Sequence, residues 1–178
     1  MNSILGLMKP RILLNIESAK NGDKVAFEKL INENKMSLYK IAMGILKDYQ
    51  DVEDAFQETI IKAYKGIVHL KKNEYFKTWI IRIMINECYK ILKINKKMLY
   101  IEDVESEDSE TDNNLNKIEV FEIVNSLEDD LKIVTLLYFY EDLPQKEIAK
   151  ILHIPPGTVR SRLFRAKEKL RLLLEYKL

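Results

Sequence analysis

Apolar residues recur every three or four positions along much of the chain, a spacing that places them on one face of an α-helix. The pattern is clearest in residues 51–67, 74–93 and 158–170. Because each segment also has a polar side, we predict three amphipathic helices that bury one face and expose the other. The predicted buried positions are Val52, Phe56, Ile60, Ala63 and Ile67 in the first helix, Ile80, Ile81, Met84, Ile85, Cys88, Ile91 and Leu92 in the second, and Val159, Leu163, Ala166 and Leu170 in the third.

A shorter helical pattern precedes the third segment. Ile148, Ala149, Ile151 and Leu152 form its apolar side, and a turn at residues 155–157, with two prolines and a glycine, separates it from the next helix. Two short helices joined by such a turn predict a helix-turn-helix, whose second helix enters the major groove of DNA.

Composition agrees with a helical protein and indicates two small domains. The 178 residues include only five Gly and four Pro, too few for the turns of an all-β fold, and 47% are hydrophobic. Residues 102–116 hold seven acidic residues and no basic one, so this stretch cannot bury enough apolar surface to fold. We predict an all-α protein with two small helical domains joined by a flexible acidic linker. The predicted parts are an N-terminal extension (1–12), a first domain (13–98), the linker (99–116) and a second domain (117–178), which contains the helix-turn-helix.

The chain carries features of a cytoplasmic protein. Its single cysteine, Cys88, excludes an internal disulfide and is expected to be a small buried apolar residue. Lys9 and Pro10 interrupt the apolar run at the start, unlike in a signal peptide. No run approaches the roughly 20 apolar residues of a membrane span, so we expect no direct membrane insertion.

Positive charge is concentrated at the end of the chain. From residue 143 onward there are nine basic and three acidic residues, a balance of +6, for which nucleic-acid phosphate is the natural counter-charge. A solvated basic helix end would account for the charge alone, but the preceding helix and turn favour DNA binding. The candidate DNA-binding residues on the outward side of the last helix are Thr158, Arg160, Ser161, Arg162, Phe164 and Arg165.

The polar side of residues 74–93 is unusual because it mixes rings, basic groups and an amide. That mixture binds single-stranded nucleic acid by stacking, phosphate pairing and hydrogen bonding to base edges. The alternative is that its two rings are half-buried packing residues. The candidate residues are Phe76, Trp79, Arg82, Asn86 and Lys90.

The polar side of residues 51–67 is acidic. Asp54, Gln57 and Glu58 lie on it, and Ile61 is exposed at its edge, which suits a docking surface for a basic protein. Taken alone, the pattern fits an ordinary solvated face with aspartates near a helix N-terminus equally well.

Three segments in order resemble the signature segments of extracytoplasmic-function sigma factors, which belong to the sigma-70 superfamily of bacterial transcription initiation factors. They read DVEDAFQETIIKAYKGI, FKTWIIRIMINECYKILK and DLPQKEIAKILHIPPGTVRSRLFRAKEKL. The resemblance implies that the first domain binds core RNA polymerase and opens the promoter −10 element, while the second reads the −35 element. By position, Asp54, Gln57 and Glu58 match the polymerase-binding helix, and Trp79, Arg82, Asn86 and Lys90 match the −10 helix. Thr158, Arg160, Ser161, Phe164 and Arg165 match the −35 recognition helix.

The resemblance also implies a regulatory partner and no enzymatic activity. Members of this family are usually held inactive by an anti-sigma factor, often a membrane-anchored one. The expected partners are thus core RNA polymerase, promoter DNA and an anti-sigma factor. Neither a cofactor nor a metal is expected, because the two histidines are far apart in sequence without companion cysteines.

The chain departs from the family pattern at two places. His153 stands where a glycine commonly ends the first helix of the helix-turn-helix, and Pro155 replaces the usual Ser or Thr cap, so a strained or rearranged turn is expected. Residues 69–73 lack the Gly and the aromatic of the family loop that captures a flipped base, so no base preference is assigned to them. The alternative function is a helix-turn-helix repressor or response-regulator effector, whose first domain senses a signal or dimerises.

Overall fold

The computed structural model describes residues 10–99 and 123–175, and every regular element within these ranges is helical. The all-α prediction is therefore confirmed. The chain divides into two compact units, Met1–Lys93 and Ile94–Leu178. The predicted linker lies outside the described residues except for its first residue, as does most of the predicted N-terminal extension.

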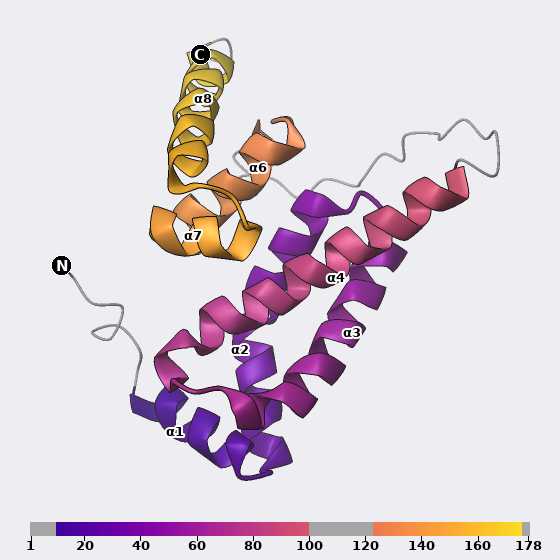
Figure 1. Cartoon of the computed structure of the whole chain (residues 1–178), viewed down its shortest axis with the longest axis vertical. Helices are drawn as coiled ribbons and strands as arrows, with labels where there is room; N and C mark the ends of the chain where they lie inside the picture. Colours follow the sequence, from indigo (N-terminus) through magenta and orange to yellow (C-terminus); the bar gives the residue numbers. More distant parts are fainter. Residues whose placement is uncertain (1–9, 100–122, 176–178) are drawn as a thin grey trace. The chain divides into compact units, whose positions relative to one another are not determined.

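The first unit is built from four α-helices and two short 3-10 turns (Figure 1). Aspartates begin two of the helices: the Asp23 carboxylate accepts hydrogen bonds from the N–H groups of Val25 and Ala26, and the Asp48 carboxylate accepts one from Asp51. These side chains satisfy N–H groups that have no partner within the helix. The elements are α1 (Pro10–Lys20), α2 (Lys24–Ile45), α3 (Tyr49–Gly66), η2 (Ile67–His69), η3 (Asn73–Tyr75) and α4 (Phe76–Leu99), which continues past the boundary of this unit at Lys93.

The apolar faces predicted for α3 and α4 form the core of the first unit together with α2. Ile60, Ile91 and Leu92 are only partly buried, and the other predicted positions are confirmed as buried. From α2 the core receives Phe27, Leu30, Leu38 and Ile41; from α3, Val52, Phe56 and Ala63, with Ile67 just after it; and from α4, Ile80, Ile81, Met84, Ile85 and Cys88.

The second unit contains α6 (Asp129–Thr135), a π-helical turn η4 (Leu136–Tyr140), α7 (Gln145–Leu152) and α8 (Pro156–Glu175). Leu127, Leu131 and Ala166 form a buried cluster, against which Leu170 packs, and this cluster joins α6 to α8. The predicted inward face of α8 is confirmed, because Val159 and Leu163 are also buried. Helices α7 and α8 are the predicted helix-turn-helix.

Backbone groups form the turn between α7 and α8. His153 adopts the left-handed conformation, with φ 53° and ψ 41°, and the N–H of Ile154 donates to the carbonyl of Ala149 at 3.1 Å. This is the hydrogen bond of a Schellman motif, in which glycine is the usual left-handed residue. The carbonyl of Pro155 accepts from the N–H of Thr158 at 2.9 Å. The expected departure is thus a left-handed histidine in an otherwise regular turn.

Within the described ranges, no helix is both long and apolar enough to cross a membrane.

Cys88 should be chemically silent in the folded protein. Its side chain is buried, and burial raises the pKa of the thiol to about 12. At pH 8 only about one thiol in ten thousand is then the reactive thiolate. We expect native protein to resist a disulfide reagent such as DTNB and to release one equivalent of chromophore in guanidinium chloride. Rapid labelling of the native protein would contradict the buried position.

Candidate nucleic-acid interface

The acidic face of α3 points outward, as predicted. Asp54, Gln57 and Glu58 are exposed, and Ile61 keeps 45% of its surface accessible. On the opposite side of the helix, Thr59 is buried and donates from its hydroxyl to the carbonyl of Ala55 at 2.7 Å. The face is therefore free to meet a partner without any change in the core.

The polar side of α4 is partly as predicted. Asn86 and Lys90 are exposed, while Trp79 and Arg82 are half-buried. Phe76 is only 1% exposed, so its placement on the exposed face was wrong. It is the first residue of α4 and directly follows η3, and its ring contributes to the core instead of facing solvent.

Trp79 packs on the end of α3. A Cβ atom on Gly66 would lie 3.1 Å from Cζ2 of the indole, so glycine is what lets the ring lie so close to the backbone. The Phe76 and Trp79 rings are also in contact, with centroids 5.8 Å apart. Trp79 is thus partly packed and partly exposed. Its interpretation as a half-buried packing residue is therefore compatible with its interpretation as a ring on which a base can stack.

The segment before α4 is held by α1. The side-chain amide of Asn73 donates to the Glu17 carboxylate at 2.7 Å, and its carbonyl accepts from Lys20 at 3.2 Å. These bonds fix the entry of the chain into α4.

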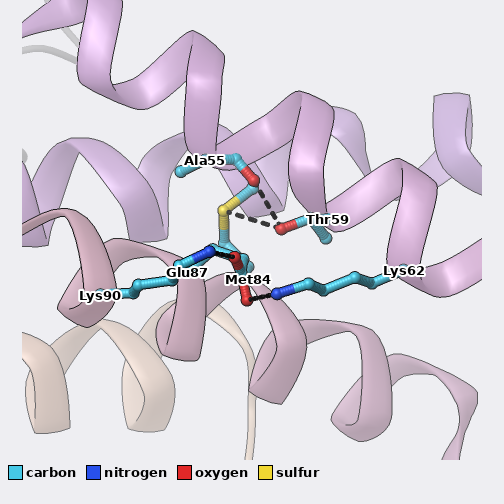
Figure 2. Close-up of polar contacts among 6 residues, drawn as sticks. All are labelled: Ala55, Thr59, Lys62, Met84, Glu87 and Lys90. Atoms are coloured by element: carbon cyan, nitrogen blue, oxygen red, sulfur yellow. Dashed lines mark hydrogen bonds and ion pairs between the residues drawn. The ribbon is translucent and has the colours of Figure 1, made fainter.

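A buried carboxylate on α4 was missed from the sequence. Glu87 is 6% exposed and lies between two lysines, as Figure 2 shows. Lys62 of α3 donates a hydrogen bond to its Oε1, and the ammonium of Lys90 lies 3.7 Å from its Oε2. The three-residue spacing of Glu87 and Lys90 along the chain is typical of an ion pair within one helix. Nothing in the sequence indicates Lys62, which lies on another helix.

The outward face of α8 is confirmed as exposed. Arg160, Ser161 and Arg165 lie open to solvent, and Phe164 is 66% exposed. Thr158 is partly buried, and its carbonyl accepts a hydrogen bond from the Ser161 hydroxyl at 3.0 Å. The fold thus presents a ring and several cations side by side on one helix surface.

Carboxylates near the start of α6 hold part of this basic face. Arg162 Nε lies 3.1 Å from Asp130, while Glu128 lies 2.6 Å from Lys169 and 3.4 Å from Arg165. The hydrogen bond from Lys169 is the main reason that the pKa of Glu128 is lowered. The ion pairs of Glu128 with Lys169 and Arg165 therefore persist at neutral pH and weaken as the pH falls through that lowered pKa. Sequence reasoning missed them because the acidic partners come from a different helix.

A helix-turn-helix whose second helix is basic is typical of DNA-binding proteins, and comparisons with known proteins identify the family of this chain. The model for Sigma-70 region 2 matches residues 30–97, and that for Sigma-70, region 4 matches residues 117–170. The ECF RNA polymerase sigma-E factor of Haemophilus influenzae is 33% identical over 176 residues, covering 86% of this chain and 89% of the relative. The RNA polymerase sigma-H factor of Pseudomonas aeruginosa is 31% identical over 170 residues, covering 86% and 88%.

A solved structure shares the fold. The sigma factor RpoE from Bartonella quintana, in complex with the anti-sigma factor NepR, matches with a TM-score of 0.73 and 21% identity, over 84% of this chain and 96% of that one. The chain belongs to the sigma-70 family, in its extracytoplasmic-function group. It is an alternative sigma factor, a transcription initiation factor and not an enzyme, so the repressor alternative is not retained.

Gly66→Ala tests the packing of Trp79 against the end of α3. The new Cβ would press on the indole, so we expect the ring to move outward by a few tenths of an ångström. Since Trp79 is the only tryptophan, its fluorescence reports this directly, and acrylamide should quench it more strongly. The free energy of unfolding should change by no more than about 1 kcal/mol, because alanine favours the helix over glycine. Gly157→Ala, where a Cβ meets nothing within 4 Å, is the control. Unchanged quenching in the Gly66 variant would refute the packing described.

Proposed function

We propose that the chain binds core RNA polymerase through α3 and directs that enzyme to promoters through α4 and α8. The observation that carries the proposal is the order of two sigma-70 regions, each with an exposed helix face of suitable chemistry. In this proposal residues 13–98 form the polymerase and −10 domain, residues 117–178 form the −35 domain, residues 99–116 link them, and residues 1–12 are an extension.

The polymerase contact is assigned to Asp54, Gln57, Glu58 and Ile61. Three polar side chains and one apolar side chain on consecutive turns of α3 suit a helical partner with basic and apolar groups.

The −10 contact is assigned to Trp79, Arg82, Asn86 and Lys90. The half-buried indole offers a rigid stacking surface, the amide of Asn86 can bond a base edge, and Lys90 can pair with a phosphate. Phe76 supports Trp79 from the core and takes no part in the contact.

The −35 contact is assigned to the outward face of α8. Arg165 lies near the middle of that face and is suited to bidentate bonding with a guanine in the major groove. Arg162, paired with Asp130, is suited to a phosphate at the edge of the groove. Thr158, Arg160, Ser161 and Phe164 complete the surface.

An anti-sigma factor, membrane-anchored as the family resemblance implies, is part of the proposal. An anti-sigma factor is bound to the structurally similar factor from Bartonella quintana. It would cover the polymerase- and DNA-binding faces until a signal releases them. Since the template is chromosomal DNA, the site of action is the cytoplasm.

Reversing charge on α3 should abolish assembly with polymerase. Asp54→Lys with Glu58→Lys changes two exposed side chains, so the helical CD and melting temperature should barely move. Binding to core enzyme, measured by gel filtration or fluorescence anisotropy, should fall at least tenfold. Glu28→Lys with Glu33→Lys, two exposed positions on α2, applies the same charge change elsewhere and should bind normally. Normal binding by the α3 variant would leave this face an ordinary solvated surface.

Promoter opening should depend on α4. Capturing an unstacked base offsets an unstacking cost of a few kcal/mol, which a protein that reads only duplex DNA does not face. With core polymerase, Asn86→Ala and Trp79→Ala should keep core binding but lose much of the run-off transcript from duplex template. A template already mismatched at −10 should restore part of it. Permanganate footprinting checks the mechanism, because wild-type complexes should expose reactive −10 thymines and the variants few. Wild-type complexes without reactive thymines would exclude this role.

A further inference from the structure

We propose that Lys62 and Glu87 are positioning residues for Lys90. Lys62 neutralises the buried Glu87 carboxylate, which leaves Lys90 able to exchange that carboxylate for a promoter phosphate. The inference rests on the proposed role of Lys90 in the −10 contact and adds two residues that do not themselves touch DNA.

Glu87 is a buried carboxylate with two cationic neighbours. Glu87 is 6% exposed, and a carboxylate in such a place is strongly destabilised unless a cation and hydrogen bonds compensate it. One positive charge is sufficient for one carboxylate. Two lysines are present, so one of them is in excess (Figure 2).

The two lysines contact Glu87 differently. Lys62 donates a hydrogen bond to Oε1, whereas Lys90 lies 3.7 Å from Oε2, within ion-pair range but beyond hydrogen-bond distance. The Lys90 side chain is also more exposed, 59% against 44% for Lys62. Lys90 is therefore the partner that can leave.

Buried side chains hold α3 and α4 together beside the Lys62–Glu87 pair. One turn before this pair on each helix, the Thr59 hydroxyl lies 3.6 Å from the Met84 sulfur, and both residues are fully buried. This packing holds α3 against α4 where Lys62 reaches Glu87. The backbone from which Lys62 extends is thus held by the core, while Lys90 lies one turn after the exposed Asn86 on the same face of α4.

The consequence is an exchange that depends on Lys62. With Lys62 in place, Lys90 can turn to a phosphate and leave no buried charge unpaired. Without Lys62, Lys90 becomes the sole compensating cation, and its departure would strand Glu87. Removing Lys62 should therefore imitate the removal of Lys90.

The test measures the affinity of the reconstituted holoenzyme, core polymerase plus each variant, for a promoter fragment mismatched at −10, across salt concentrations. Log affinity falls as log salt rises, and each lost phosphate contact makes that negative slope shallower by about 0.7 to 0.9. The slope of Lys90→Met should be shallower by that amount. The slope of Lys62→Met should change equally, although in this proposal Lys62 does not contact DNA. The Lys62→Met/Lys90→Met double variant is compared in a Glu87→Gln background, where no buried charge is left unpaired, and there its slope should be no shallower than that of Lys90→Met alone.

Three further variants separate positioning from other effects. Lys62→Arg should retain the wild-type slope, because a cation still pairs with Glu87. In a Glu87→Gln background, Lys62→Met should have no effect on the slope, since no carboxylate then competes for Lys90. Lys65→Met removes an exposed lysine from the same helix and should match wild type. CD melting of every variant checks whether its helices are intact.

The outcomes are distinguishable. If Lys90→Met lowers the slope and Lys62→Met does not, the positioning role is overturned while the proposed −10 contact stands. If Lys90→Met has no effect, the assigned contact of Lys90 fails and the inference fails with it. An equal loss from Lys65→Met would mean that general positive charge accounts for the result, which also overturns the inference. If Lys62→Met does not fold, Glu87→Gln is compared with Glu87→Gln/Lys62→Met. A shallower slope in the double variant would then contradict the positioning role of Lys62.

Discussion

The packing of α4 against α3 determines which side chains of the first unit can meet a partner. Ile80, Ile81, Met84, Ile85 and Cys88 fill one side of α4 completely, and burial of so much apolar surface fixes the rotation of the helix about its axis. A rotation by one residue, about 100°, would expose these side chains and bury Asn86 or Lys90. The polar face is therefore placed by the core, and the same core orients the acidic face of α3 outward.

Both units hold cations of their proposed DNA-binding surfaces on carboxylates. In the first unit the carboxylate is buried and belongs to Glu87; in the second, Glu128 and Asp130 are much more exposed. The energetic consequences differ, because exposed pairs are screened by solvent and contribute little to stability, whereas a buried carboxylate must keep a partner. In the proposed complex, a base edge can thus displace Glu128 from Arg165 easily, whereas a phosphate can displace Glu87 from Lys90 only because Lys62 remains.

Periodicity predicted the helices and their buried faces well, because a period of 3.6 residues determines direction within one helix. It failed at Phe76, the first residue of α4. There the direction of the side chain depends on how the chain enters from η3 as well as on the helical period. It also gave no information on pairing between helices. Lys62 and Glu87 are 25 residues apart, and no spacing rule connects them. Charge counts likewise predicted a basic α8 but not the acidic partners from α6 that hold it.

The turn between α7 and α8 explains why two departures from the family pattern leave the helix-turn-helix intact. The bonds that form this turn, Ile154 N–H to Ala149 and Thr158 N–H to Pro155, join backbone groups, so they do not depend on a capping side chain. A left-handed histidine carries a conformational cost of about 1 kcal/mol relative to glycine. Burial of Val159 and Leu163 on α8, and of Ile148 and Ile151 on α7, contributes more than that. The direction of the recognition helix is thus set by packing between the two helices, and the turn residue need only be able to follow it.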